Sequence, residues 1–391
     1  ERDLLYGQPA TLPVLNLSYY PAERGPYNLD REVDSEGYLL NPGSRWGGIT
    51  RPLETRDFET ANIEYIEFWL MDPFVGDTTG VSSGGDLYFH LGEISEDVLR
   101  DGKKFFENGL PVDRDSSAVD KSIWGLNPKR QSTVYGFDNS LGEEYREKQD
   151  VGLNGLSSEE EKNFPTYVQY LEELKPRLSE TTLARMITDR NSPLNDPAGD
   201  LFQHYRGEEQ DRMQLSILQR YKYYNGTEGN SLAPDNEAGY NSASRNTPDV
   251  EDIDRDNTLN EQEAYYIYSV SLRREELQTG RNHIAEKREA SVTLRNGRHD
   301  KVTWYLFRIP INDYQSKTGN IEGFNNIRFM RMLLTGFEKP TFLRFATLGL
   351  VRSEWRSYQG DLNTGGSLTG QGQLTTEAVN IEENSNRTPV N

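Results

Sequence analysis

The chain has 391 residues, a formal net charge of −20 at pH 7 and no cysteine. Such an acidic surface repels nucleic acid phosphates and anionic lipid, so we expect no binding to DNA or RNA. The lack of cysteine excludes disulfides, cysteine-ligated zinc and thiol catalysis. No apolar run approaches the about 20 residues of a membrane helix, and the first residues show neither an initiator methionine nor a signal peptide. We therefore expect a segment of a larger protein that itself has no membrane-spanning part.

Residues 1–115 have the pattern of β structure with long loops. Runs rich in β-branched and aromatic residues, bounded by turn formers, predict strands at 12–20, 46–53, 62–70 and 87–94. The glycine- and serine-rich run 77–85 predicts a flexible connection between the last two strands. We interpret residues 1–115 as a first β-sandwich module.

The middle of the chain changes character. Residues 116–157 hold many turn formers and predict an irregular connection, whereas residues 158–225 carry helical periodicity. Ser158 with Glu161 matches a capping box, and the pair Asp196-Pro197 is a helix start signal. These helices form an insertion that needs another surface to pack on, and we expect that surface to be the adjoining β structure.

The last third returns to β structure. Residues 226–263 predict a loop with an acidic motif, and residues 264–356 predict a second β-sandwich module. The expected strands of this module are 265–272, 291–294, 302–311, 327–334 and 341–351. Residues 357–391 predict an extended tail with one candidate strand at 374–381.

A stretch of the first module is repeated in the second. Residues 62–70 read Asn-Ile-Glu-Tyr-Ile-Glu-Phe-Trp-Leu, and residues 326–334 read Asn-Ile-Arg-Phe-Met-Arg-Met-Leu-Leu. A tryptophan strand that closes with proline precedes each copy, and a strand containing Leu-Gly (Leu91-Gly92 or Leu348-Gly349) follows each copy. The shared order favours an internal duplication over two unrelated β segments.

The second copy also resembles a known fold. The Trp304 strand, its Pro310-Ile-Asn-Asp313 turn and the runs 326–329 and 344–348 are similar to the second half of galactose-binding-like jelly rolls, as in many carbohydrate-binding modules. Apolar strands separated by turn clusters agree with a two-sheet sandwich. We therefore predict a mainly β chain of two jelly-roll-like β-sandwich modules with a helical insertion between them. The fold alone does not establish sugar binding.

One acidic motif has the spacing of a calcium-binding loop. Calcium takes about six to eight oxygen ligands, and residues 252–263 place carboxylates at the loop positions that supply them. Asn257 replaces the usual glycine, and a strand rather than a helix is expected to follow. An acidic linker or capped turn is the alternative interpretation, and calcium is the only cofactor that we expect. The predicted ligands are Asp252, Asp254, Asp256, the Thr258 carbonyl, Asn260 and Glu263.

Catalytic patterns are weak. The sequence holds no nucleophile elbow, phosphate loop or HExxH motif, and its four histidines are scattered, so we expect no enzyme activity. Four tyrosines near the start either line a sugar or peptide platform or pack in the core and at interfaces, and packing is favoured. The histidines are His90, His204, His283 and His299, and the tyrosines are Tyr19, Tyr20, Tyr27 and Tyr38.

Several long runs resemble one family. They are similar to SprA, also called Sov, the very large outer-membrane translocon of the Bacteroidetes type 9 secretion system. The resemblance extends from about Tyr19 to the last residue, and long runs are far more specific than short motifs. The runs are 19–28, 46–53, 66–74, 85–98, 105–111, 251–259 and 381–391.

This resemblance implies a soluble extramembrane segment of a giant single-chain β-barrel that exports folded cargo and adhesins and serves gliding motility. Its implied location is the cell-surface or periplasmic face of the outer membrane. Its implied partners are the rest of the barrel, plug and shuttle proteins, and secreted cargo. We hypothesise a non-catalytic segment that caps, lines or gates the barrel mouth or contacts cargo. The alternative is a surface glycan- or peptide-binding module.

Overall fold

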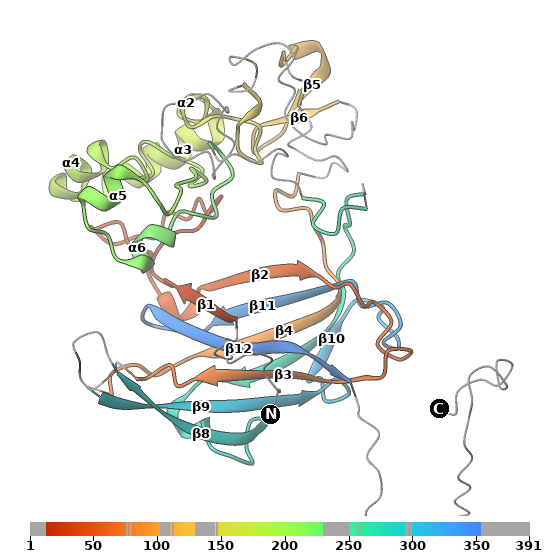
Figure 1. Cartoon of the computed structure of the whole chain (residues 1–391). Helices are drawn as coiled ribbons and strands as arrows, with labels where there is room; N and C mark the ends of the chain where they lie inside the picture. The colour runs from red at the N-terminus through yellow and green to blue at the C-terminus, as the bar shows by residue number, and fades with distance from the viewer. Residues whose placement is uncertain are drawn as a thin grey trace, which may run out of the picture. The chain divides into compact units, whose positions relative to one another are not determined.

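The computed structural model is drawn in Figure 1. Two antiparallel five-stranded sheets dominate it. The first sheet has the order β1 (Val14–Tyr19), β12 (Thr341–Arg352), β3 (Ile63–Met71), β9 (His299–Pro310) and β8 (Ile284–Thr293). The second has the order β10 (Ser316–Thr318), β7 (Ala264–Ser271), β4 (Asp86–Glu93), β11 (Phe329–Thr335) and β2 (Trp46–Pro52). The structure describes residues 13–75, 77, 80–101, 110–111, 113–129, 145, 148–229, 251–256, 258–293, 297 and 299–352.

Strand β3 shows why these runs form a sandwich. Its β-branched and aromatic residues favour extended backbone, and Ile66, Phe68 and Leu70 are fully buried. The Phe68 ring stacks on Phe307 of the same sheet at 4.9 Å and contacts Phe89 of the other sheet at 5.4 Å between ring centroids. Both sheets supply side chains to one hydrophobic core, so they pack face to face. The predicted mainly β, sandwich-type fold is confirmed.

The two copies of the repeat are interleaved in these sheets. Strand β3 of the first copy lies between β12 and β9 of the second, and β11 of the second lies between β4 and β2 of the first. The pairing register also agrees, because Trp46 lies opposite Thr335 and Trp304 lies opposite Met71, which are corresponding positions. Strands β1 and β7, which precede the copies, pair with β12 and β4 in the same way.

This interleaving corrects the expectation of two separate sandwich modules at 1–115 and 264–356. Both segments contribute strands to each sheet and side chains to the same core. Strands β3 and β11 each need hydrogen-bonding partners on both edges, and strands of the other copy supply them. Periodicity in a sequence marks a strand without identifying the strand beside it, which is why the two copies appeared to be independent.

The Leu-Gly pairs of the two copies are not structural counterparts. The register between β12 and β3 shifts between Ala346 and Gly349, and Thr347 has a φ of 53°. This bulge places Gly349 opposite Glu67, whereas Gly92 lies opposite Phe329. Val351, which faces the corresponding residue of β3, occupies the place of Gly92.

The helical insertion packs on the loop between β1 and β2. Val33 and Leu39 of that loop are buried with Tyr170, Leu174 and Met186 of the insertion. A two-stranded sheet of β5 (Val119–Lys121) and β6 (Leu126–Pro128) precedes the helices. The helices are α2 (Ser158–Glu161), α3 (Pro165–Leu174), α4 (Glu180–Thr188), α5 (Glu208–Arg212) and α6 (Ile217–Tyr221). No helix in the described part of the chain is both long and apolar enough to cross a membrane.

Two local predictions in the insertion are wrong. The capping box joins Ser157 and Glu160 rather than Ser158 and Glu161, so the Glu161 side chain is left for other contacts. The Asp196-Pro197 pair starts no helix, and the segment folds into turns. The predicted strand at 374–381, the tail 357–391 and most of the loop 226–250 lie outside the described residues.

Candidate functional site

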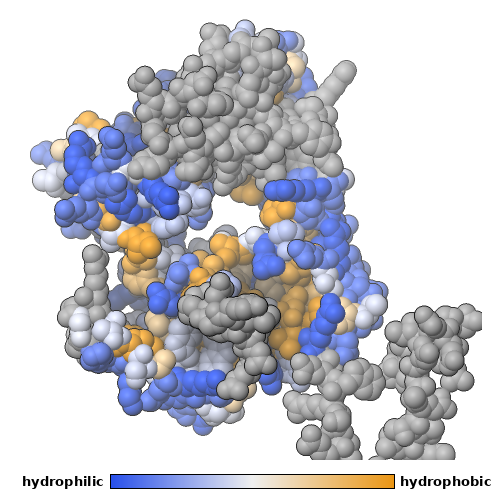
Figure 2. Space-filling view, viewed as in Figure 1, coloured by the Kyte–Doolittle hydropathy of each residue, from blue (hydrophilic) through white to orange (hydrophobic). Residues whose placement is uncertain are grey.

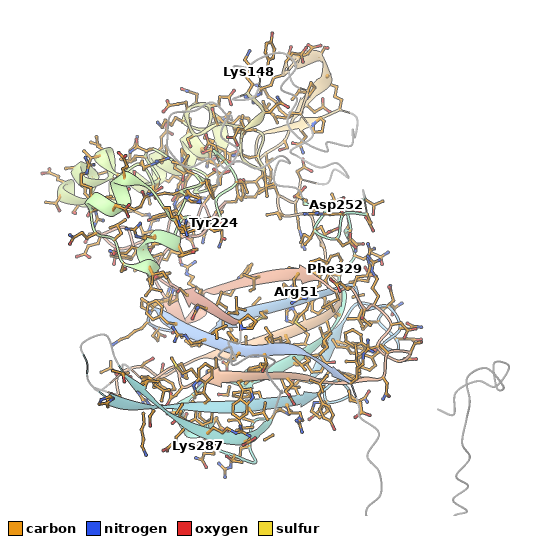
Figure 3. The ribbon with its side chains drawn as sticks, viewed as in Figure 1. Arg51, Lys148, Tyr224, Asp252, Lys287 and Phe329 are labelled. Atoms are coloured by element: carbon orange, nitrogen blue, oxygen red, sulfur yellow. The ribbon has the colours of Figure 1, made fainter. Side chains whose placement is uncertain are left out.

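The acidic segment, residues 251–263, leads directly into β7. It lies at the end of the second sheet where β4 finishes and β11 begins, and Figure 3 shows Asp252 beyond the same end of that sheet as Phe329. The sequence predicts its residues as a calcium loop. The structure places those residues against charged side chains from three other parts of the chain.

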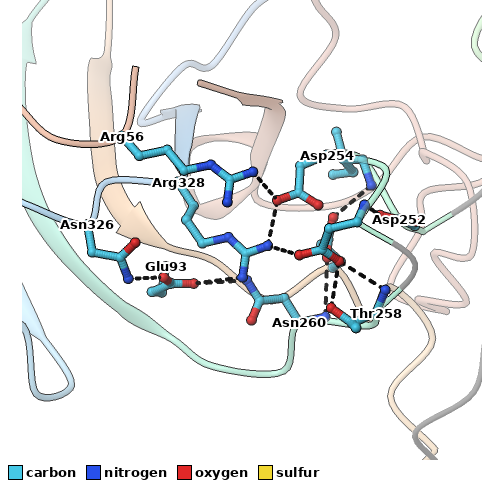
Figure 4. Close-up of polar contacts among 11 residues, drawn as sticks. Arg56, Glu93, Asp252, Asp254, Thr258, Asn260, Asn326 and Arg328 are labelled. Atoms are coloured by element: carbon cyan, nitrogen blue, oxygen red, sulfur yellow. Dashed lines mark hydrogen bonds and ion pairs between the residues drawn. The ribbon is translucent and has the colours of Figure 1, made fainter. Parts of the chain in front are cut away.

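Two of the predicted ligands converge on an arginine (Figure 4). The Asp254 carboxylate accepts hydrogen bonds from Arg328 Nη2 at 2.6 Å and from Arg56 Nη2 at 3.2 Å. Asp256 also pairs with Arg328, and it accepts bonds from the N–H and hydroxyl of Thr258 at 2.9 and 2.6 Å. The side chain of Asp254 is only 2% exposed, so the guanidinium groups compensate a buried negative charge.

A second set of contacts holds the middle of the acidic segment. Asn260 donates from Nδ2 to Glu93 Oε2 at 2.9 Å, and its carbonyl accepts from the Glu96 N–H at 2.8 Å. The Glu96 carboxylate in turn accepts from the N–H groups of Ile253 and Asn260 at 2.7 and 3.2 Å. Asn326 donates to the other oxygen of Glu93 at 2.6 Å, so the loop before β11 joins the network.

Burial shifts two titrations in this network. Glu96 is 2% exposed, and burial together with the neighbouring Asp254 charge raises its pKa to about 7 against the effect of its hydrogen bonds. His90 is buried on β4, where burial and the positive charge of Arg331 lower its pKa to about 4. His90 is therefore neutral at pH 7, and its Nδ1 accepts a hydrogen bond from Arg331 Nε at 3.0 Å.

The end of the acidic segment has its own cations. Glu263 pairs with Arg100 at 3.2 Å and with Arg331 at 3.5 Å between nitrogen and oxygen. Arg331 also lies over the Tyr265 ring, 4.9 Å from its centroid, and that ring stacks on His90. Glu263 is thus held away from the aspartates that were predicted to share an ion with it.

The structure therefore does not bring the six predicted ligands to one point. Asp254 and Asp256 face Arg328, Asn260 faces Glu93, and Glu263 faces Arg100 and Arg331. A smaller group does form, because Glu96, Asp252 and Asp254 each place a carboxylate oxygen within 4.8 Å of the others. Only Asp252 and Asp254 of the predicted ligands belong to this group, and calcium binding by the predicted loop stays a prediction.

Sequence reasoning missed the basic half of this site. Arg328 and Arg331 stand where the first copy of the repeat has Glu64 and Glu67, and this charge reversal is visible in the sequence. Glu67 pairs instead with Arg308 of the neighbouring strand β9 at 2.6 Å. A reversal of charge between two copies was the signal that could have predicted an acidic partner for the second copy.

A cleft of about 510 Å³ lies among the β1–β2 loop, the start of β2 and the helical insertion. Tyr19, Tyr20 and Tyr38 line it with Trp46, while Tyr27 lies outside the lining and is partly buried against Leu156 and Tyr167. Thus three of the four tyrosines considered for a platform share one cleft. Figure 2 shows that the visible surface of the insertion is mostly hydrophilic. Arg24, Arg185 and Lys222 are the basic residues of the lining.

Comparison with known proteins identifies a family for the larger part of the chain. The family model described as "motility related/secretion protein" matches residues 169–391. The match begins in α3 and includes the acidic segment and the second copy of the repeat. No curated protein matches the chain.

Proposed function

Because the chain belongs to the SprA_N family of motility-related and secretion proteins, we propose that it is a non-catalytic extramembrane segment of an outer-membrane protein-export translocon. The family supports a role in motility or secretion and an association with the cell envelope. Within that role we propose type 9 secretion with gliding motility, in which the segment would help to cap or gate the barrel. Its proposed partners are the rest of the barrel, the plug and shuttle proteins, and secreted cargo.

The clasp, defined as Arg56, Arg328 and the Asp254 and Asp256 carboxylates, is the observation that carries this proposal. It fastens the acidic segment before β7 to the loops that precede β3 and β11, in a sandwich where both copies of the repeat share one core. A sandwich with one shared core and an acidic segment held by charge pairs suits a structural part of a large assembly. In this proposal Asp254 and Asp256 fix the position of the acidic segment and take no part in catalysis.

A charge reversal tests the clasp in the intact secretion apparatus. Arg328→Glu should reduce cargo secretion and gliding while the translocon is still present in the envelope, because the reversed charge repels Asp254 and Asp256. Adding Asp254→Lys should recover part of the secretion. Arg288→Glu is the matched control, since that arginine side chain is 68% exposed and its pairing partner is two residues away.

Normal secretion and gliding by the Arg328→Glu strain, with wild-type amounts of protein in the envelope, would contradict the proposal. Loss of the Arg328→Glu protein from the envelope would show that the single variant fails to fold. The double variant with Asp254→Lys then tests the role of the clasp. If the double variant restores the amount of protein without restoring secretion, the clasp does not have the proposed role.

The cleft favours a second candidate function, binding of a surface glycan or peptide. Aromatic faces stack on sugars and on peptide side chains, and Trp46 is 71% exposed in the lining. A glycan and peptide array should then show saturable binding that Trp46→Ala removes. Tyr314→Ala serves as the control, because Tyr314 is 38% exposed and is not part of the lining. Absence of any saturable ligand would reject this candidate.

A further inference from the structure

A second acidic cluster lies in the helical insertion, away from the acidic segment. Glu161, Asp196 and Asp200 are 0%, 2% and 0% exposed. Each places a carboxylate oxygen within 4.8 Å of the others. Three carboxylates at such spacing inside a protein repel one another strongly, because little water screens them. The chain must compensate this charge with protons or with a cation.

Hydrogen bonds hold the three side chains in place. Asp196 accepts bonds from the N–H groups of Gly199, Asp200 and Leu201 at 2.8, 3.2 and 3.2 Å. Glu161 accepts from Asn154 Nδ2 at 2.6 Å and from the Ala198 N–H at 2.9 Å. The cluster is thus fixed by the backbone turn at 196–201 and by the end of α2.

Asp200 provides an observation independent of the clustering. Its Oδ2 accepts a hydrogen bond from the Tyr27 hydroxyl at 2.6 Å. Its Oδ1 is buried and receives no hydrogen bond from the residues that the structure describes. A buried carboxylate oxygen without a donor is costly, and a bound cation would satisfy it.

The charged surroundings of Asp200 are also acidic. Burial and the charges of Glu161, Glu228 and Asp196 raise the pKa of Asp200 well above its usual range. The nearby Arg24 directs its guanidinium to the carbonyl oxygens of Asp196 and Pro197. Arg24 therefore stabilises the turn by donating to its backbone carbonyl oxygens rather than to the carboxylates.

We propose that Glu161, Asp196 and Asp200 bind one divalent cation of the calcium class. The three ligands are hard oxygens, and no histidine or cysteine belongs to the group, which favours calcium over zinc or copper. The ion would join the end of α2 to the 196–201 turn. Through Tyr27, it would also join both to the β1–β2 loop, so binding would fasten the helical insertion to the chain that enters the sandwich.

The first test uses the whole chain after treatment with chelator. Calorimetric titration with CaCl₂ should show saturable binding, and calcium should raise Tm relative to the chelated protein. Terbium should bind in its place and luminesce on tyrosine excitation, because Tyr27 and Tyr167 lie beside the cluster. The absence of calcium binding together with a Tm that chelator leaves unchanged would overturn the proposal and show that protons compensate the cluster.

Matched variants locate the ion. Asp200→Asn and Glu161→Gln keep the size of each side chain, and each should weaken calcium binding more than about tenfold and abolish the terbium signal. Glu159→Gln, also on α2, removes the same charge from a side chain that is 82% exposed and should leave binding unchanged. Asp252→Asn should likewise preserve the terbium signal.

A third variant changes shape rather than charge. The Cβ of an alanine at Gly152 would lie 1.9 Å from Asp200 Oδ2, so Gly152→Ala must displace that carboxylate. It should weaken calcium binding without removing any charge. Calcium binding that survives in Asp200→Asn, Glu161→Gln and Gly152→Ala alike would place the ion elsewhere and overturn the assignment. If Asp200→Asn does not fold, Glu161→Gln and Gly152→Ala decide.

Discussion

Single residues at the clasp carry charges that the fold has buried. Asp254 is the clearest case, because its side chain is 2% exposed and two arginines from separate loops reach the same oxygen. A buried carboxylate destabilises the fold strongly if such partners are removed, because its charge is then uncompensated. Arg328 therefore matters more than the many ion pairs on the surface, which contribute about 0–1 kcal/mol each.

Removal of Arg328 should reveal that difference. Arg328→Ala should lower the free energy of unfolding by about 3 kcal/mol, because it leaves buried acidic groups with too little compensation. Arg288→Ala should cost much less, because that side chain is 68% exposed and water screens its ion pair with Glu286. Urea unfolding of both variants measures the two values, and equal losses would contradict the inferred role of Arg328. The double change Arg328→Ala with Asp254→Asn should cost less than the sum of the single changes.

His90 and Glu96 should give opposite pH dependences of stability. Glu96 has a pKa of about 7 in the folded chain against 4.5 ordinarily, so it favours folding at low pH and loses that contribution as pH rises from 4.5 to 7. His90 has a pKa of about 4 against 6.5, so its burial costs stability below pH 6.5, and the cost disappears as pH rises from 4 to 6.5. The two effects largely cancel in the wild-type chain.

Separate variants expose each contribution. Between pH 4.5 and 6.5, stability should rise more steeply with pH in Glu96→Gln than in the wild type, and less steeply in His90→Gln. Each difference should be at most about 1.4 kcal/mol per pH unit. Urea unfolding across this range measures the slopes. Parallel curves for the three proteins would refute the assigned shifts.

Among the structural elements, the sequence predicted strand positions well and strand partners poorly. The strands at 12–20, 46–53, 62–70 and 87–94 form within a few residues of their expected bounds, because their composition and flanking turns are local signals. The neighbour of each strand depends on contacts between distant segments. The same limit applies at the site, since the spacing at 252–263 is local whereas Arg56 and Arg328 come from elsewhere.

A residue predicted from a local sequence signal can make the expected hydrogen bonds in a different local structure. Asp196 was expected to cap a helix by accepting backbone N–H groups, and its carboxylate does accept three of them. Those donors belong to a turn that continues into no helix. The capping residue was recognised, but the residues after it, Ala198-Gly199-Asp200, form the turn that brings Asp200 beside Glu161.

The interleaved strands predict that both halves of the sandwich unfold together. Phe68 is fully buried and contacts Phe307, Phe89 and Phe345, so Phe68→Ala should cost about 3–5 kcal/mol. Limited proteolysis should then cut 13–101 and 264–352 at the same rate. Trp304→Ala should cost less, because Trp304 is only partly buried. Selective digestion of one half would contradict a shared core.

The whole molecule carries 63 acidic against 43 basic side chains, so repulsion opposes its compact state. Monovalent salt screens this repulsion at the surface within a Debye length and should raise Tm modestly. Salt screens the buried cluster of Glu161, Asp196 and Asp200 much less. General screening and specific binding should therefore be separable.

Tm at matched ionic strength provides the separation. Calcium chloride should raise Tm above the value in sodium chloride, with saturation, because an ion that binds only the folded chain stabilises it in proportion to the logarithm of its excess over Kd. Magnesium should give a smaller gain, since it requires a tighter octahedral shell that three fixed carboxylates do not provide. Asp200→Asn should lower the calcium gain, whereas Glu159→Gln should keep it. If calcium, magnesium and sodium give one common curve against ionic strength, screening of the net charge accounts for the whole effect.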